Sequence, residues 1–322
     1  MSDERGNIMT VKDELLKMLE ENGGKELSGQ VIADRLGVSR SAVWKAISSL
    51  NKEGCRIEAG RGTGYRLVES GDLLSPERVR FFLPEKMKKN QIIVLKTVDS
   101  TNTFAKKAAA DGAGHGTLII AEEQTGGRGR RGNSFYSPSG TGLYMTVILR
   151  PGAADVDLIT VCAGCGACRA IETITGKKPL IKWVNDLYLD GKKICGILSE
   201  ATFDYEAKTI DSAVVGIGIN ISTDTFPLGL DQKAGKIGAP IERAVLAAKV
   251  TECFFECLER SREENIADYK SRSLVLNRKV SFVKDGVEHS ATAVDIDMKG
   301  RLIVESEGSV MTLNSGEISV KL

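Results

Sequence analysis

The stretch Gln124-Thr-Gly-Gly-Arg-Gly-Arg-Arg-Gly132 decides between two classes of fold. It contains Gly-x-Gly-x-x-Gly, a spacing that leads from a strand directly into a helix in dinucleotide-binding folds. Here Asn133-Ser-Phe-Tyr-Ser-Pro-Ser-Gly140 follows, and this composition is typical of a loop. Four glycines let the backbone wrap an anion, and three arginines bind phosphate or carboxylate in a bidentate manner. The stretch therefore predicts an anion-binding loop rather than a dinucleotide fingerprint or a merely solvated basic loop.

A second polar motif, Lys182-Trp-Val-Asn-Asp186, precedes a predicted hairpin with Asp190-Gly191 at its turn, and Lys192-Lys193 follows the turn. Magnesium prefers oxygen ligands, and phosphates require cations. Taken singly, each of these residues is an ordinary surface charge. Near an arginine loop, they indicate a nucleoside triphosphate with Mg²⁺.

The region around both motifs alternates strand-like and helix-like patterns. We predict a helix that Ser100 caps and Gly112 ends, a small-residue helix over 156–175, and a long helix from Pro240 to about Arg260. Residues 91–273 should therefore form an α/β domain with a mixed sheet. Besides the 186–199 hairpin, its predicted strands are Ile92–Leu95, Thr117–Ala121, Gly142–Leu149 and Ala213–Ile221.

The first 68 residues have the order of a winged helix-turn-helix domain. Helical periodicity covers residues 11–20 and 28–36, Gly37 closes the second helix, and Ser39 caps a third. Two short strands, Cys55–Ile57 and Tyr65–Val68, flank a glycine-rich hairpin tip. Residues 69–90 read as a connector with one short helix after Pro76.

Charge within this first domain is segregated, although the whole chain has a formal net charge of only +1. Residues 1–38 hold five basic and eight acidic side chains (5 − 8 = −3), whereas residues 39–66 hold six and two (6 − 2 = +4). A basic third helix and wing favour DNA binding over an ordinary solvated hairpin or a protein-contact module. The predicted DNA-binding residues are Ser39, Arg40, Ser41, Trp44, Lys45 and Arg61.

Residues 274–322 consist of short alternating runs punctuated by turn signals such as Asp285-Gly286, Lys299-Gly300 and Gly308. Such spacing is typical of a small all-β barrel. With the two preceding domains, the chain is expected to be of the α+β class.

Composition excludes several other classes of protein. Hydrophobic residues at 42% and charged residues at 27% are globular values, and no apolar run approaches the ~20 residues that span a bilayer. The N-terminus lacks a signal-peptide core, and seven scattered cysteines fit a reducing environment, so we expect a cytoplasmic protein without membrane partners. Cys162, Cys165 and Cys168 lack a fourth ligand at ferredoxin spacing and fit a packed helix better than a metal site. The chain has only two histidines, too few for a histidine metal cluster.

These motifs together resemble those of biotin protein ligases. Asp99-Ser-Thr-Asn102, the glycine-arginine loop, Lys182-Trp-Val-Asn-Asp186 with Lys193 and Gly196, and Gly216-Ile-Gly-Ile-Asn220 occur in that family's order. The resemblance covers residues 78 to the end, and the added winged helix is similar to that of the bifunctional biotin operon repressors. It implies a ligase fold with an SH3-like C-terminal barrel.

The resemblance also implies an activity. Members of the family join biotin to ATP to give biotinyl-adenylate and then transfer biotin to a lysine of a carboxylase carrier domain. The bifunctional type also binds operator DNA and represses transcription in response to biotin. By similarity, Lys193, Arg128 and Arg130 would act in catalysis. Biotin would contact Ser100, Thr101, Asn102, Gln124, Arg128, Gly129, Arg130 and Lys193, and ATP or the adenylate would contact Arg130, Arg131, Phe135, Lys182, Asn185, Asp186 and Asn220.

Two residues depart from the family pattern. Val184 replaces the usual proline of the lysine-tryptophan motif, a change that affects local rigidity. Phe135 stands where the repressor type has a tryptophan able to stack on adenine, and phenylalanine can still stack. Two alternatives remain: a ligand-sensing regulator without ligase activity, and a lipoate ligase, which lacks the glycine-arginine signature. A homodimer favoured by biotinyl-adenylate would supply two winged helices to a palindromic operator.

Overall fold

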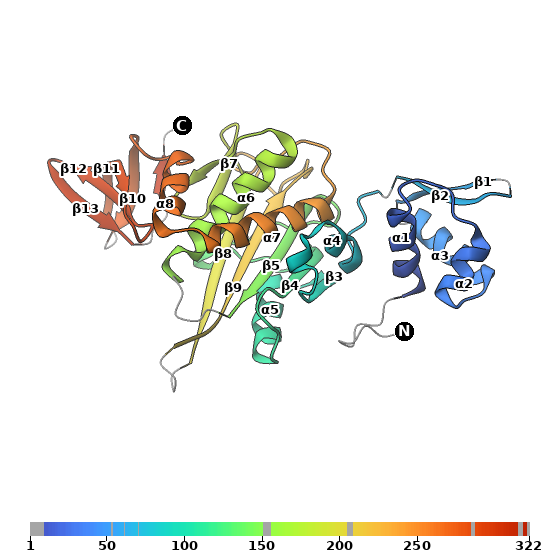
Figure 1. Cartoon of the computed structure of the whole chain (residues 1–322). Helices are drawn as coiled ribbons and strands as arrows, with labels where there is room; N and C mark the ends of the chain where they lie inside the picture. Colours follow the sequence, from blue (N-terminus) through green and yellow to red (C-terminus); the bar gives the residue numbers. More distant parts are fainter. Residues whose placement is uncertain are drawn as a thin grey trace. The chain divides into compact units, whose positions relative to one another are not determined.

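A computed structural model describes residues 10–320, with gaps at 53, 61, 70, 151–155, 205–208, 285–286 and 315–317. Its contacts divide the chain into two compact units, which are treated separately below (Figure 1). The first comprises residues up to 82 together with 242–245, and the second comprises 83–241 with 246–322.

The first unit begins with three helices and a two-stranded wing. Thr10 forms a capping box with Asp13 at the start of α1, Ser28 caps α2, and Gly37 ends α2 in the left-handed conformation. The Ser39 hydroxyl accepts from the Ala42 amide at 3.2 Å and so caps the third helix, as the sequence predicts. The elements are α1 (Val11–Glu21), α2 (Gly29–Leu36), α3 (Arg40–Lys52), β1 (Arg56–Gly60), β2 (Gly64–Glu69) and α4 (Pro76–Phe82).

Two buried arginines organise the end of this unit. Arg78 on α4 pairs with Glu20 on α1 and with Glu242, and its guanidinium lies 5.3 Å from the ring centre of Phe82. Arg243 donates through Nε to the Asp72 carboxylate at 2.6 Å. Because buried charges are costly unless paired, these contacts hold α4 against the three-helix core.

The second unit is built on a seven-stranded mixed sheet of order β3-β4-β5-β9-β8-β7-β6. Its β3–β4 pair is parallel and the other pairs are antiparallel. Asp190 and Gly191 both have positive φ, as the predicted two-residue hairpin turn requires. The strands are β3 (Ile92–Val98), β4 (Leu118–Gln124), β5 (Gly142–Leu149), β6 (Leu180–Lys182), β7 (Asp186–Leu189), β8 (Lys192–Asp204) and β9 (Thr209–Asn220).

Helices pack on this sheet through small or apolar side chains. Helix α5 (Thr101–Ala110) buries Ala105 and Ala109, and helix α6 (Ile159–Thr175) buries its three cysteines as reduced thiols. A side chain at Gly166 of α6 would lie 2.8 Å from the backbone of Phe254, so α6 and α7 (Arg243–Glu259) pack closely there. Helix α8 (Arg262–Ser271) follows α7 and lies against α6.

The C-terminal part forms a five-stranded antiparallel sheet of order β13-β12-β11-β10-β14. Trp183 Nε1 donates to the Gly300 carbonyl at 2.9 Å and thereby ties the turn before β12 to the large sheet. The predicted turn at 285–286 lies outside the described residues. The strands are β10 (Lys279–Lys284), β11 (Val287–Ile296), β12 (Leu302–Ser306), β13 (Ser309–Leu313) and β14 (Ile318–Val320).

The predicted α+β architecture is confirmed, but three details differ from expectation. Strand β6 and helix α8 were not predicted. Ser100 occupies the N-cap position of α5 without making a side-chain cap, because its buried side chain faces the cleft described below. Within the described part of the chain, no helix is both long and apolar enough to span a bilayer.

Candidate functional site

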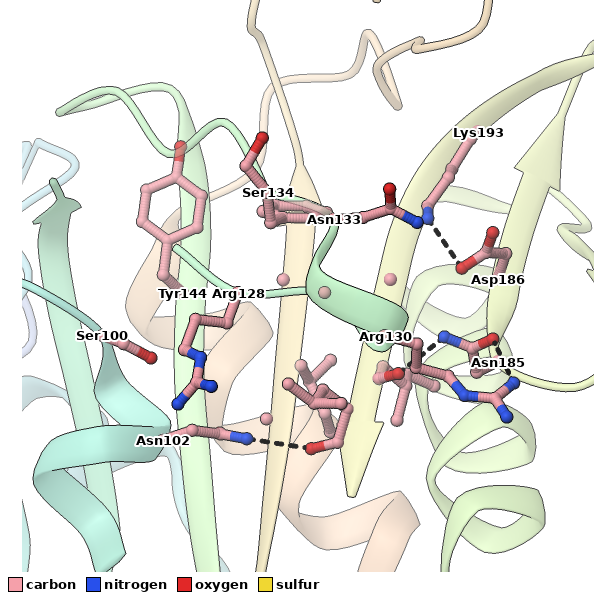
Figure 2. Close-up of a pocket in the computed structure, with 18 of the residues that line it drawn as sticks. Ser100, Asn102, Arg128, Arg130, Asn133, Ser134, Tyr144, Asn185, Asp186 and Lys193 are labelled. Atoms are coloured by element: carbon pink, nitrogen blue, oxygen red, sulfur yellow. Dashed lines mark hydrogen bonds and ion pairs between the residues drawn. The ribbon is translucent and has the colours of Figure 1, made fainter. Parts of the chain in front are cut away.

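An open cleft, about 950 Å³ with the solvent space at its mouth included, lies in the second unit, over the end of the large sheet (Figure 2). It brings together residues from the start of α5, the glycine-arginine loop, the β6–β7 connection and strands β5, β8 and β9. Thirteen residues that the sequence analysis assigned to ligand contact line it: Ser100, Thr101, Asn102, Gln124, Arg128, Gly129, Arg130, Arg131, Phe135, Lys182, Asn185, Asp186 and Lys193.

The glycine-arginine loop folds back on itself at the mouth of the cleft. The Gly129 amide donates to the Asn133 carbonyl at 2.7 Å, and the Phe135 amide donates to the Gly127 carbonyl at 2.9 Å. A Cβ atom at Gly127 would lie 2.3 Å from the Phe135 carbonyl oxygen, so only glycine fits this close approach. The loop is therefore shaped by its own backbone, which leaves its arginine side chains to face the cleft.

The charge of the lining is strongly positive. Among the described lining residues, five are basic and one, Asp186, is acidic. Partial burial lowers the pKa of Arg130, and nearby Arg131 adds to this effect, but a guanidinium stays charged at neutral pH. A cleft of this kind attracts a polyanion or two anionic groups at once. Its cations are Arg128, Arg130, Arg131, Lys182 and Lys193.

Two polar pairs cross this positive region. Lys193 Nζ lies 2.7 Å from Asp186 Oδ1, and Arg130 Nη1 donates to Asn185 Oδ1 at 3.3 Å (Figure 2). The orientation of the Asn185 side chain is fixed by strand β8, because its Nδ2 donates to the Ile197 carbonyl at 2.7 Å. The Lys182–Asp186 motif and the arginine loop, which lie some 50 residues apart in sequence, thus form a single surface.

The other end of the cleft is rich in uncharged polar side chains, and the Arg128 guanidinium lies there beside Ser100 and Asn102 (Figure 2). The Gln124 side-chain carbonyl accepts from the Thr101 amide at 2.9 Å and lies 3.0 Å from its hydroxyl. Gln124 Nε2 donates to the Ser137 hydroxyl at 2.9 Å. Because Gln124 has partners on both sides, its orientation is set before any ligand enters.

Below this end lies a buried polar network that the sequence analysis missed. Asn102 Nδ2 donates to Glu200 at 2.9 Å and to the Leu198 carbonyl at 3.1 Å, and Thr146 lies 2.7 Å from Asn102 Oδ1. Burial alone would raise the pKa of Glu200, but hydrogen bonds from Lys106 and Asn102 outweigh burial and hold it below its usual value. Since Thr146 and Glu200 stand singly within strands, no sequence motif marks them.

Phe135 lies inside the cleft against a floor of glycines. Cβ atoms built at Gly218 and Gly196 would lie 2.6 Å and 3.2 Å from its ring. These two glycines of the quoted motifs therefore make room for an aromatic ring on strands β8 and β9. By contrast, Asn220 lies outside the cleft lining, and its buried Nδ2 donates to the Gly235 carbonyl at 3.0 Å.

The third helix of the winged helix presents a polar face to solvent. Val43, Ala46, Ile47 and Leu50 are buried in the core, whereas the DNA-contacting residues predicted on this helix and at its N-cap are exposed. Trp44 is 61% exposed, which is unusual for so large an apolar side chain and marks a contact surface. The exposed residues are Ser39, Arg40, Ser41, Trp44 and Lys45.

The wing contributes less free positive charge than its composition indicates. Arg66 Nη2 lies 2.8 Å from Glu58, and Arg56 Nε lies 3.9 Å from the same carboxylate. Arg61, predicted at the wing tip, lies outside the described residues. The exposed cations of α3 are therefore the clearest candidates for phosphate contacts.

Comparisons with known proteins match three regions of the chain. A model of the biotin/lipoate A/B protein ligase family matches residues 94–220, an HTH-domain model matches 12–66, and a model of the biotin protein ligase C-terminal domain matches 275–321. The biotin protein ligase of Aquifex aeolicus, solved in complex with biotin and ATP, has a TM-score of 0.62 and 30% identity. The match covers 72% of this chain and 99% of that one. Fold and cleft together define a biotin/lipoate ligase joined to a winged helix.

Relatives that match nearly the whole chain identify a more specific family within this class of ligases. The chain is 32% identical to the bifunctional ligase/repressor BirA of Bacillus spizizenii over 97% of its own length and 99% of the relative. It is 30% identical to the BirA protein of Escherichia coli K12, with coverage of 97% and 98%. The chain belongs to the family of bifunctional biotin ligase/repressors.

Proposed function

We propose that the cleft joins biotin to ATP and passes the activated biotin to a lysine of a carboxylase carrier domain. The observation that carries this proposal is one cleft with four cations at one end and, at the other, preorganised uncharged polar side chains beside a single cation, Arg128. A uniformly positive site would suit a nucleotide alone. A site with two such ends suits a nucleotide beside an uncharged ring system that carries a carboxylate.

In the first step, a biotin carboxylate oxygen attacks the α-phosphorus of ATP. A carboxylate–phosphorus bond forms, the bond to the β-phosphate oxygen breaks, and pyrophosphate leaves. The two reactants repel one another because both are anions, and fixed cations offset this repulsion in the transition state. Lys193, Arg128 and Arg130 are the side chains we assign to this role.

In the second step, the neutral amine of a carrier lysine attacks the acyl carbon of the mixed anhydride. A C–N bond forms, the C–O bond to AMP breaks, and the amine gives up a proton. The departing AMP carries the charge that develops, so the same cations stabilise the leaving group. The enzyme itself forms no covalent bond in this scheme.

We assign the two substrates, biotin and ATP, to different ends of the cleft. The side chains that would contact biotin are Ser100, Thr101, Asn102, Gln124 and Arg128, with the Gly129 backbone, and Met145 and Ile217 supply apolar surface. Arg130 and Lys193 would lie between biotin and ATP. Arg131, Lys182 and Asn185 would contact ATP, and Phe135 would face the adenine. Asp186, the one carboxylate among the described lining residues, supplies the oxygen ligand that Mg²⁺ prefers, and bound Mg²⁺ would neutralise phosphate charge.

The winged helix supports a second function, repression of transcription in response to biotin. Its exposed α3 surface holds Arg40 and Lys45 beside the projecting Trp44, a combination suited to phosphate and base contacts in a major groove. One domain reads one half-site. We therefore propose that biotinyl-adenylate promotes a homodimer, which would bind a palindromic operator more tightly than the monomer.

Incubation of the full chain with ATP, Mg²⁺ and either biotin or lipoate tests the enzymatic proposal. We expect pyrophosphate to be released with biotin but not with lipoate. An added carboxylase carrier domain should gain the mass of one biotinyl group. Release with lipoate instead would identify a lipoate ligase. Biotin binding without pyrophosphate release would identify a sensor that lacks catalysis.

A further inference from the structure

The Lys182–Asp186 motif lies at the exposed edge of the large sheet and needs support from outside that sheet. Strand β6, which ends at Lys182, has only three residues and pairs with β7 on one side. On its other side, the Ile181 amide donates to the Arg272 carbonyl at 2.7 Å, and the Leu274 amide donates to the Ile181 carbonyl at 2.8 Å. The segment that follows helix α8 thus supplies the missing backbone partner.

Tyr269, one turn earlier in α8, reaches further along the same motif. Its side chain is fully buried, and its hydroxyl donates to the Val184 carbonyl at 2.9 Å. Burial raises the pKa of the phenol well above its usual value, so the hydroxyl remains a donor at neutral pH. Val184 immediately precedes Asn185 and Asp186, the residues that meet Arg130 and Lys193 in the cleft.

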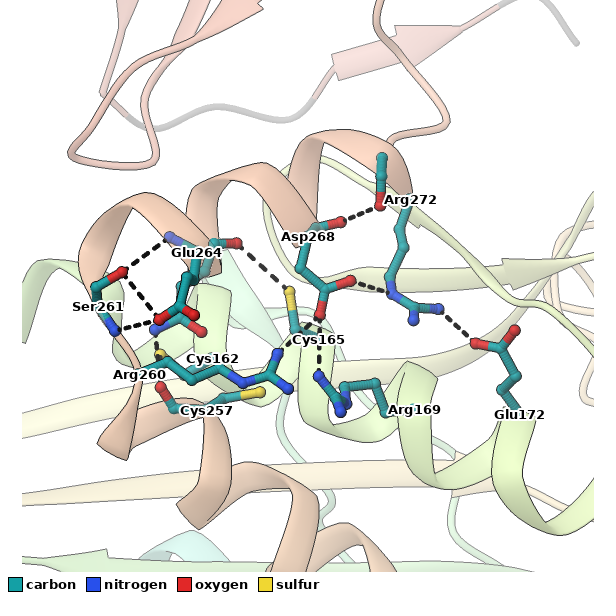
Figure 3. A network of polar contacts seen from close by, with 12 residues as sticks. Cys162, Cys165, Arg169, Glu172, Cys257, Arg260, Ser261, Glu264, Asp268 and Arg272 are labelled. Carbon is teal, nitrogen blue, oxygen red and sulfur yellow. Dashed lines mark hydrogen bonds and ion pairs between the residues drawn. The ribbon is translucent and has the colours of Figure 1, made fainter.

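Helix α8 is itself firmly held against α6 (Figure 3). Asp268 accepts from Arg272 Nε at 2.8 Å and lies 3.5 Å from Arg260 and 3.6 Å from Arg169. Arg272 also donates to Glu172 of α6 at 2.9 Å. Because Asp268 and Tyr269 are adjacent, this ionic network fixes the base from which the tyrosine extends.

We propose that Tyr269 is a positioning residue for the nucleotide-binding half of the cleft. By holding the Val184 carbonyl, it sets the direction of the backbone that presents Asn185 to Arg130 and Asp186 to Lys193. Thr101, Asn102 and Gln124 are held by separate contacts with β4, β5 and β8, so the biotin half does not depend on it. This inference rests on the proposed ligase function.

The test replaces Tyr269 by Phe in the full chain, which removes one oxygen atom and preserves the ring. We expect KM for ATP to rise about tenfold, because a buried carbonyl loses its donor and the motif shifts, while KM for biotin stays within about twofold. The matched control is Thr251→Val, which removes a buried hydroxyl that donates to Ala247 within α7. Both variants should lose some thermal stability, but only Tyr269→Phe should change the ratio of the two KM values.

A rescue variant separates positioning from packing. Replacing Tyr269 by 4-aminophenylalanine restores a donor at the same place and should bring KM for ATP back towards the wild-type value. A Tyr269→Phe enzyme with unchanged KM values, or with both KM values raised in the same proportion, overturns the proposal, as does failure of the rescue. If the wild-type chain itself releases no pyrophosphate with biotin and ATP, the proposed function fails instead.

Discussion

The Nζ atom of Lys193 lies 2.7 Å from Oδ1 of Asp186, although the two residues stand on opposite strands of the Asp190-Gly191 hairpin. The hairpin thus delivers a cation and a carboxylate to one point of the cleft. Their pairing holds Lys193 in place before any anionic substrate arrives, so little reorganisation is needed when charge develops.

Replacement of Lys193 by Ala should slow adenylate formation by about a hundredfold, because the lost cation acts mainly on the transition state. Single-turnover release of pyrophosphate measures this step. Lys192→Ala is the control, since Lys192 is the neighbouring residue on β8 and lies outside the cleft lining. Equal rates for the two variants would remove Lys193 from the mechanism.

Arg128→Ala should weaken retention of biotinyl-adenylate, with dissociation on the order of tenfold faster, because a charge-assisted contact is lost. The rate can be followed by chasing bound radioactive adenylate with unlabelled ligand. Arg35→Ala removes an exposed arginine of α2 in the first unit instead and should leave that rate unchanged. Wild-type retention by the Arg128 variant would place the adenylate elsewhere.

The double variant Arg40→Ala/Lys45→Ala should bind random-sequence duplex DNA more weakly without loss of ligase activity. Each lost phosphate contact should reduce the salt dependence of binding, the slope of log K against log salt, by about one. Lys17→Ala, an exposed lysine of α1, is the control. Undiminished DNA affinity in the double variant would exclude the exposed face of α3 as the contact surface.

Replacement of Glu20 by Gln should destabilise the first unit by about 3 kcal/mol, because it leaves the buried Arg78 charge partly uncompensated. Thermal unfolding followed by circular dichroism provides the measurement. Glu21→Gln changes an exposed neighbour that pairs only loosely with Lys17, and it should have little effect. The same contact makes point variants on α3 a cleaner test of DNA binding than removal of residues 1–66, which would delete Glu20.

Sedimentation velocity should show a shift from monomer to dimer when biotin and ATP are added together. Linkage then requires that dimerisation tighten adenylate binding in return. The controls are the wild type with biotin alone and with ATP alone, since neither sample can form adenylate. A dimer in either control would show that the adenylate is not required, and an unchanged mass with both ligands would argue against a ligand-operated switch.

Much of the architecture follows from local signals in the sequence. Ser28, Gly37 and Ser39 mark helix ends by chemistry that depends only on neighbouring residues, and Asp190-Gly191 selects its turn type in the same way. Helix α8 escaped prediction because it is mostly polar and buries few residues, although the Ser261–Glu264 capping box at its start was readable. Strand β6 is too short for a periodicity to appear.

The cleft residues that carry motifs were predictable, whereas their supports were not. Thr146 meets Asn102 across 44 positions of sequence, and Tyr269 meets Val184 across 85. Such partners are fixed by tertiary packing, so a single sequence holds no local sign of them. Ser100 shows the converse, since its sequence position indicates a cap but burial turns its side chain towards the cleft.

The hydrogen bond from Trp183 to the Gly300 carbonyl has a consequence for folding during synthesis on the ribosome. Gly300, and Ile318 at the cleft wall, are synthesised after every strand of the large sheet. The nascent chain can therefore assemble the large sheet before Gly300 is available to accept the hydrogen bond from Trp183. We expect a ribosome-bound chain halted before residue 300 to fold the large sheet but not to bind nucleotide. Nucleotide binding should appear only after strands β12 to β14 have emerged from the ribosome. Nucleotide capture by such a halted chain would contradict this order of maturation.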